Sequence, residues 1–294
     1  MTEIPRSHPR YQSLLARELI TQGVLSGITS KHGLIAQGRG EAFDYLIGEK
    51  TIDSAAHAET CACALLLLAE NPVISVNGNA AALVSSGLVT LAEVLDAKLE
   101  VNLFHRTDER VELITKYLEE AGAKHVLGRT AEPLLDLDHE RNRAERDGLY
   151  SADVVLVLLE DGDRCNVLTQ MDKIVIAVDL NPLSRTSQTA HVSIVDNIVR
   201  VIPNMIEIAR EMKGMDDEKL WEFVDSFDNG IALADAIEEI KVNLTGVQYE
   251  LLSGTDFDPK KGHEISDEQK RALEEERIRK KREVLMKGSD LILE

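Results

Sequence analysis

The fold is indicated by the stretch Val73-Ile-Ser-Val-Asn-Gly-Asn-Ala-Ala-Ala82, in which a short apolar run passes into a small turn that contains glycine. The run Val73–Val76 has the near-continuous apolar, β-branched character of a strand that is covered on both faces. A small turn that opens a helix lets backbone N–H groups approach an anion. The stretch predicts a strand, a turn and a helix, and the turn is either a phosphate site or an ordinary tight connection.

Five more apolar segments follow, at residues 99–104, 125–127, 153–159, 173–178 and 192–195. Helical spacing separates them, most clearly over residues 107–122, where Val111, Ile114 and Leu118 recur at three and four residues and Gly122 stands in the position of a C-terminal cap. Alternating strands and helices are typical of an α/β fold with a parallel sheet. We interpret residues 71–212 as a Rossmann-like core.

Helical segments are expected on both sides of this core. Residues 1–70 form a helical N-terminal region that contributes to the ligand site, with one helix after Pro9 and a second over about 53–70. Residues 213–257 hold two C-terminal helices, at 216–224 and 232–244.

The last segment, residues 258–294, differs in composition and is interpreted as a charged helical extension. Ser266 and Gln269 make a capping box for a helix over 267–287, in which acidic and basic residues alternate and few are apolar. Such a helix gains little from burial, so we expect the extension to be dispensable for chemistry.

Composition limits the partners. The chain has 294 residues, with 33 basic and 52 acidic side chains and a formal net charge of −19. This balance argues against broad binding to nucleic acid. The longest apolar run, residues 61–69, is far shorter than the roughly 18 residues of a membrane helix, and no signal segment is visible at the N-terminus. Cys61, Cys63 and Cys165 suit buried thiols in a reducing compartment, so a cytoplasmic protein is expected.

Polar residues follow the predicted strands, where an open parallel sheet binds its ligands. They include Asn77, Asn79, His105, Arg106, Asp161, Asp163, Asp179, Asn181, Arg185 and Thr186. Aspartate and asparagine can bind a ribose or a base edge, and arginine and threonine can donate to phosphate, although an exposed loop is polar too. The two aspartates that flank Gly162 could hold Mg²⁺ or simply form a turn.

The first 40 residues are locally basic, with five Lys and Arg against two Glu. Arg10 and Arg17 are seven residues apart and would share one side of a helix that extended back to Arg10. Arg39 lies between Gly38 and Gly40, which would allow a guanidinium and its backbone to approach a phosphate closely. The alternative interpretation is a solvated basic surface.

Several catalytic motifs are missing from the sequence. It has no G-x-G-x-x-G fingerprint, Walker loop or G-x-S-x-G elbow, and no two histidines at i, i+4. These absences disfavour a dinucleotide-dependent dehydrogenase, a hydrolase and a zinc enzyme. His8 and His105 lie outside the predicted elements, whereas His57, His125 and His191 fall within them and suit structural roles.

Five blocks, in the right order, resemble the archaeal phosphopantothenate synthetase family, also called 4-phosphopantoate–β-alanine ligase: residues 4–11, 33–48, 72–79, 159–164 and 179–186. The match covers roughly residues 3–245. The resemblance implies a Rossmann-like homodimer that joins 4-phosphopantoate to β-alanine with ATP, in coenzyme A biosynthesis. It implies an acyl-adenylate, released AMP and diphosphate, and a need for Mg²⁺.

The resemblance also implies ATP-binding positions at Arg17, Arg39, Asp179, Leu180, Asn181, Arg185, Thr186, Asn197 and Ile198. Candidates for substrate binding are Arg10, Asn77, Asn79 and Arg106, and candidates for catalysis are His8, Arg106, Asp161 and Asp163. Two other functions stay open: a regulatory module that binds a nucleotide without ligation, and a dehydrogenase on the same scaffold.

Overall fold

The computed structural model describes residues 5–8, 10–136, 140–159 and 162–253. Its internal contacts divide the chain into two units, Met1–Ile240 and Lys241–Glu294. The sheet, its helices and the site described below belong to the first unit. Asp161 and the predicted extension 258–294 lie outside the described residues.

The core is a six-stranded parallel sheet, which confirms the predicted α/β class. Its order is β3 (Val126–Leu127), β2 (Lys98–Val101), β1 (Val73–Val76), β6 (Val154–Leu158), β7 (Ile174–Val178) and β8 (Val192–Ile194). All six correspond to the apolar segments of the sequence. A short antiparallel pair, β4 (Glu132–Pro133) and β5 (Arg143–Ala144), stands apart from this sheet.

Strand β1 lies at the point where the strand order reverses. Ile74 is paired with Leu99 of β2 on one side and with Leu156 of β6 on the other. Connections from the two sides leave in opposite directions at such a point and open a crevice at the carboxyl ends of the strands. The topology therefore places the expected ligand site beyond Val76.

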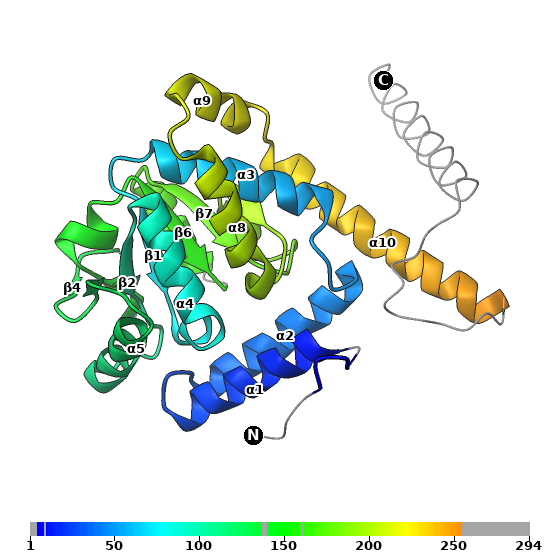
Figure 1. Ribbon diagram of the computed structural model, residues 1–294, viewed down its shortest axis with the longest axis horizontal. Helices are drawn as coiled ribbons and strands as arrows, with labels where there is room; N and C mark the ends of the chain where they lie inside the picture. Colours follow the sequence, from blue (N-terminus) through cyan, green and yellow to red (C-terminus); the bar gives the residue numbers. More distant parts are fainter. Residues whose placement is uncertain (1–4, 9, 137–139, 160–161, 254–294) are drawn as a thin grey trace, which may run out of the picture. The chain divides into compact units, whose positions relative to one another are not determined.

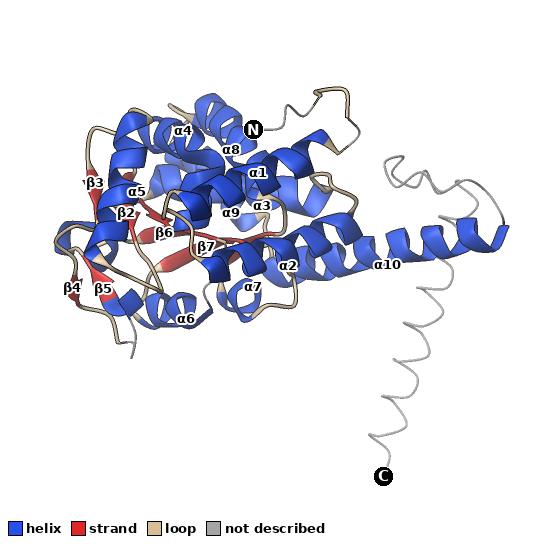
Figure 2. Ribbon diagram, turned by 90° about the horizontal axis from the view of Figure 1, so that it is seen from below, coloured by secondary structure: helices blue, strands red, loops and turns tan. Residues whose placement is uncertain are grey.

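Alternate residues of each strand face two separate hydrophobic cores. Ile74, Leu156 and Ile176 join one core, which also contains side chains of α3 (Asp53–Leu68), α4 (Gly78–Leu95), α5 (Asp108–Glu120) and α8 (Ile198–Met212). Val73, Val155 and Val175 face the other, together with residues of α6 (Gly162–Gln170). Figure 2 shows α4 and α8 on one side of the strands and α6 with α7 (Arg185–Thr189) on the other.

The N-terminal region is a pair of helices that lie side by side, α1 (Tyr11–Leu25) and α2 (Lys31–Ile47) (Figure 1). The sequence predicts α1 and α3, but it predicts no helix over residues 31–47. Ser30 begins α2, because its hydroxyl accepts a hydrogen bond from the Gly33 amide at 3.1 Å, and Gly48 ends it with a φ of 101°. These capping signals are present in the sequence, but three glycines inside the helix weaken its pattern.

The remaining elements agree closely with the sequence. Thr107 caps α5 and Gly122 follows it with a φ of 110°, as the spacing predicts. Helix α9 (Asp217–Asp225) also forms as predicted, whereas α10 (Asn229–Ser253) is longer than the predicted 232–244. Two short helical turns, Glu140–Asn142 and Arg146–Tyr150, connect β4 to β6 around β5.

Packing explains two apolar features of the sequence, the long helix α4 and the three cysteines. Within the described ranges, only α4 is long and apolar enough to cross a membrane, and more than half of it is buried in the fold. It packs in the first core with α8 and the sheet. The three cysteines are buried free thiols, as expected, and burial raises the pKa of the Cys61 thiol to about 12.

Candidate active site

A cavity of about 580 Å³ opens at the carboxyl ends of the strands. Helix α2 and the residue that caps it line one part, and the segments after β1, β2, β6, β7 and β8 line the rest. This volume is typical of sites for small molecules. The lining residues are Ser30, His32, Gly33, Ala36, Gln37, Arg39, Gly40, Phe43, Asn77, Gly78, Asn79, Leu103, Phe104, His105, Arg110, Leu159, Asp179, Leu180, Asn181 and Asn197.

Arg39 lines the cavity from the middle of a helix. Gly38 and Gly40, which in the sequence indicate close approach to a phosphate, both belong to α2. A Cβ added to Gly40 would lie 3.6 Å from Leu180 Cδ1, which is an ordinary contact, and a Cβ on Gly38 would meet nothing within 4 Å. The glycines therefore do not form a phosphate loop, and the helix presents Arg39 instead.

The turn after β1 is the N-terminus of α4. Asn77 caps this helix by accepting from the Ala80 amide at 3.0 Å and donates to the Leu158 carbonyl at 2.8 Å. Asn79 donates to the Gly33 carbonyl at 2.8 Å and so ties α4 to α2. A Cβ on Gly78 would lie 2.2 Å from the Ile28 carbonyl oxygen, so this position needs glycine for packing. The first amides of α4 carry a partial positive charge toward the cavity.

The segment after β7 is held by its own hydrogen bonds. Asp179 accepts from the Asn181 amide at 3.0 Å and from the Ser184 hydroxyl at 2.5 Å. Burial raises the pKa of Asp179, and the hydrogen bond from Ser184 and the charge of Arg39 oppose that rise. The carboxylate and the guanidinium thus interact across the cavity.

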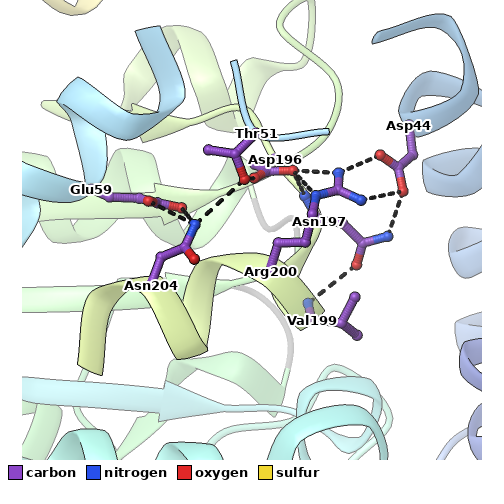
Figure 3. A network of polar contacts seen from close by, with 8 residues as sticks. All are labelled: Asp44, Thr51, Glu59, Asp196, Asn197, Val199, Arg200 and Asn204. Atoms are coloured by element: carbon purple, nitrogen blue, oxygen red, sulfur yellow. Dashed lines mark hydrogen bonds and ion pairs between the residues drawn. The ribbon is translucent and has the colours of Figure 1, made fainter. Parts of the chain in front are cut away.

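A buried polar network holds the segment after β8 (Figure 3). Asn197 Nδ2 donates to Asp44 Oδ2 of α2 at 2.7 Å. Arg200 donates to Asp44 and to Asp196, with Nη2 2.5 Å from Asp44 Oδ1 and Nε 2.8 Å from Asp196 Oδ1. Asp196 also accepts from the Thr51 hydroxyl at 2.5 Å. The network joins α2, the start of α3 and α8 around a residue of the cavity.

The sequence did not indicate Arg110, His32 or Arg200 as residues of the cavity or of its support. Arg110 Nη2 donates to the Ile28 carbonyl at 2.9 Å, and its other nitrogens bond to the carbonyls of Gly27 and His105. His32 stacks on His105 with 4.7 Å between ring centroids. Arg200 could have been found from its i, i+4 spacing to Asp196, whereas no local signal indicates that Arg110 reaches the α1–α2 loop.

The cavity gathers only part of the predicted site. It contains Arg39, Asn77, Asn79, Asp179, Leu180, Asn181 and Asn197. The predicted residues outside its lining are His8, Arg10, Arg17, Arg106, Asp163, Arg185, Thr186 and Ile198.

The residues outside the lining have other contacts. Arg10, which precedes the first residue of α1, and Arg17 of α1 both pair with Glu41, at 3.0 Å and 2.5 Å. Arg185 pairs with Asp163 at 2.9 Å. Arg106 donates to the Gly128 carbonyl at 2.7 Å, and His8 accepts from the Arg10 amide at 3.0 Å. Thr186 and Ile198 are buried.

Comparison with known proteins agrees with the resemblance seen in the sequence. Residues 54–243 match the family model described as phosphopantothenate/pantothenate synthetase. The chain is 57% identical to the 4-phosphopantoate–β-alanine ligase of Methanosarcina mazei over 244 residues, which are 83% of this chain and 96% of that protein. It is 52% identical to the Thermococcus kodakarensis ligase of the same name over 252 residues, 85% and 97% of the two chains. Identity to the Methanospirillum hungatei ligase is 49% over 244 residues, 83% and 99% of the two chains.

Proposed function

The chain belongs to the phosphopantothenate/pantothenate synthetase family, and we propose that it joins 4-phosphopantoate to β-alanine in an ATP-dependent, AMP-forming reaction. The product, 4′-phosphopantothenate, serves coenzyme A biosynthesis. Relatives named for this ligation match more than four fifths of the chain. The extension from about residue 258 lies beyond the family match, which ends at residue 243.

The observation that carries the proposal is that one cavity collects the ends of five strands together with α2. Ligation needs two anionic substrates in contact, and their repulsion must be offset. Arg39 and the N-terminus of α4 both line this cavity in a chain whose net charge is −19. Local positive groups of this kind bind phosphates in a protein that repels anions at long range.

The proposed chemistry has two displacements. The carboxylate of 4-phosphopantoate attacks the α-phosphorus of ATP, which forms the acyl–phosphate bond and releases diphosphate. The neutral amine of β-alanine then attacks the acyl carbon, an amide bond forms, the nitrogen loses a proton to solvent, and AMP leaves with the electron pair of the broken bond. Neither step needs a covalent nucleophile from the protein. The chain aligns the substrates, offsets charge on the phosphates and excludes water from the mixed anhydride.

We assign the nucleotide to the β7–β8 side of the cavity. Asp179, Asn181 and Asn197 supply oxygen and amide groups suited to a ribose or a base, and Arg39 faces phosphate. We assign 4-phosphopantoate to the side of Asn77 and Asn79, where the first amides of α4 suit its phosphate. Roles for Arg10, Arg17, Arg106, Arg185, Thr186 and Ile198 in binding stay predictions.

Magnesium is best treated as part of the nucleotide. The described residues contain no group of three or more His, Cys, Asp or Glu side chains that could hold a metal ion, and Asp163 is paired with Arg185. Mg²⁺ usually keeps several waters and is held by substrate phosphates with one or two carboxylates. We therefore expect Mg²⁺ to enter with ATP.

We also propose a cytoplasmic homodimer. Leu25, Leu34 and Ile35 of the N-terminal helices are 75%, 44% and 73% exposed, and apolar side chains of this kind suit a contact between subunits. Light scattering should give twice the chain mass of 32.6 kDa. A fully active preparation at the mass of one chain would contradict the dimer.

Incubation of the protein with ATP, Mg²⁺, 4-phosphopantoate and β-alanine tests the function. We expect AMP, diphosphate and the mass of phosphopantothenate, with none of the three when 4-phosphopantoate is left out. Exchange of labelled diphosphate into ATP should need 4-phosphopantoate but not β-alanine. ADP with orthophosphate as products, or equal activity on pantoate, would contradict the proposal. ATP binding without AMP would indicate the regulatory alternative.

A further inference from the structure

Helices α2 and α8 meet at a cluster of charged and amide groups that no proposed chemical step uses: Asp44, Asp196, Asn197 and Arg200. Asp44 of α2 is 5% exposed and accepts hydrogen bonds from two residues of the β8–α8 segment, Asn197 and Arg200. Both of its oxygens are engaged, since Arg200 Nη1 also lies 3.3 Å from Oδ2. This carboxylate therefore connects the helix that carries Arg39 to the segment that carries Asn197.

Arg200 holds two carboxylates that would otherwise repel each other. Its guanidinium contacts Asp44 and Asp196, whose side chains are 6% and 0% exposed, while its own side chain is 24% exposed. Two buried carboxylates near one another are unfavourable without a shared cation. The two acids in turn raise the pKa of Arg200, against the effect of burial.

Residues of other elements also hydrogen-bond within or beside this cluster. Thr51, between α2 and α3, donates to Asp196 at 2.5 Å, and the Asp196 carboxylate accepts from the Asn197 amide at 2.6 Å. Asn204, one turn beyond Arg200 on α8, donates to Glu59 of α3 at 3.1 Å. Figure 3 shows these groups as one connected series from Glu59 to Asp44. A guanidinium at its centre is thus held in a single orientation.

Arg200 is outside the lining of the cavity, but its contacts determine where two lining residues lie. Asn197 is oriented by Asp44, which Arg200 holds. Arg39 lies five residues before Asp44 on the same helix, and α2 reaches the β7 side at Gly40, next to Leu180. Loss of the Arg200 contacts would shift or loosen α2 against the β7–β8 side of the cavity. The hydrogen bonds from Asn79 to Gly33 and from Asn77 to Leu158 would remain.

We propose that Arg200 is a positioning residue for the nucleotide, which sets the separation between α2 and the β8 end through Asp44 and Asp196. The inference rests on the proposed function for the identity of ATP. We expect Arg200 to affect the binding of ATP only, because the 4-phosphopantoate side of the cavity, at α4, is held by separate hydrogen bonds.

Steady-state kinetics of Arg200→Ala, with Arg210→Ala as a matched control, test this role. Arg210 lies on the same helix and pairs with Glu207 at 3.1 Å on the surface. We expect Arg200→Ala to raise KM for ATP about tenfold or more, since small displacements of aligned groups have large effects, and to change KM for 4-phosphopantoate less than twofold. Arg210→Ala should match the unaltered protein. Equal rises in all KM values would overturn the inference.

Two further variants keep the test decisive if Arg200→Ala does not fold. Arg200→Lys retains the charge but cannot span both carboxylates, and Asp44→Asn retains the shape but loses one charge. Both should weaken ATP binding measured by calorimetry without the other substrates, with an unchanged affinity for 4-phosphopantoate. Normal ATP affinity in both variants would overturn the role of Arg200. The same titration separates the two proposals: an unaltered protein that binds ATP but makes no AMP contradicts the ligase function alone, and one that binds no ATP contradicts both.

Discussion

Helix α2 carries two carboxylates three residues apart, and each meets arginine in different surroundings. Glu41 accepts from Arg10 at 3.0 Å and from Arg17 at 2.5 Å, and these arginine side chains are 38% and 52% exposed. Asp44 meets Arg200, which is 24% exposed, and its own side chain is almost fully buried. Both contacts are carboxylate–guanidinium pairs, and they differ most in their access to water.

This difference assigns separate roles to the two sides of α2. Exposed ion pairs contribute little because water and salt screen them. A buried pair is expensive to break, since the remaining charge has neither its partner nor water. The Glu41 contacts attach α2 to α1, whereas the Asp44 contacts determine how α2 meets the cavity.

Removing each carboxylate in turn is the strongest test of this contrast. Asp44→Ala should lower the free energy of unfolding by about 3 kcal/mol, because it leaves Arg200 and Asn197 without a buried partner. Glu41→Ala should lower it by less than about 1 kcal/mol. Urea unfolding at low and high salt measures both, and only the Glu41 effect should shrink with salt. Equal losses for the two variants would contradict the contrast.

Arg39 lies on the same helix and faces the cavity, so its loss should affect activity and leave the fold intact. Arg39→Ala should reduce kcat/KM by about a hundredfold, for a charge-assisted phosphate contact of roughly 3 kcal/mol. Arg39→Lys should recover only part of this, since an ammonium cannot make a two-pronged contact. Arg129→Ala is the control, because Arg129 pairs with Glu112 and Glu119 away from the cavity. Near-normal turnover of Arg39→Ala would assign Arg39 to the surface.

Glu59 is another buried carboxylate, like Asp44, and should make the free energy of unfolding depend on pH. Burial raises the pKa of Glu59 to about 8, although Asn204 donates to it. Between about pH 5 and pH 8 the folded protein holds a proton that the unfolded chain has lost, so this group makes stability fall as pH rises over that range and leaves it unchanged above about pH 8.

Glu59→Gln removes this titration and keeps the shape of the neutral acid. Thermal unfolding should show similar stability of variant and parent at pH 5 and a variant more stable by about 4 kcal/mol at pH 9. A stability difference that does not change with pH would show that Glu59 is ionised in the folded protein.

The smallest effect is expected for Arg17. The family resemblance predicts that Arg17 binds ATP, whereas in the structure it forms an ion pair with Glu41. We expect Arg17→Ala to raise KM for ATP about fivefold with unchanged stability, for an exposed contact of about 1 kcal/mol. Glu41→Gln releases Arg17 and should not raise KM for ATP. No change in KM for Arg17→Ala would leave Arg17 as part of the surface cluster only.

The sequence alone predicted the parallel sheet, most of the helices and the family. All six strands of the sheet lie in segments rich in apolar residues, and α5 shows its cap, its spacing and its terminal glycine within 16 residues. These signals are local, because the period of a strand or helix is set by neighbouring residues. The strand ends indicated Asn77, Asp179 and Asn181, since the carboxyl ends of parallel strands meet at one edge.

Only the tertiary structure decided which of these residues share a cavity and what holds them. Nothing local indicates that Asp44 meets Arg200, 156 residues away, or that Arg39 projects from a helix instead of a glycine loop. Burial separates Asp44 from Glu41 and turns Glu59 into a group that titrates near pH 8. The physical reason is that contact between distant residues and exclusion of water depend on how whole elements pack, and hydrophobic periodicity carries no information on either.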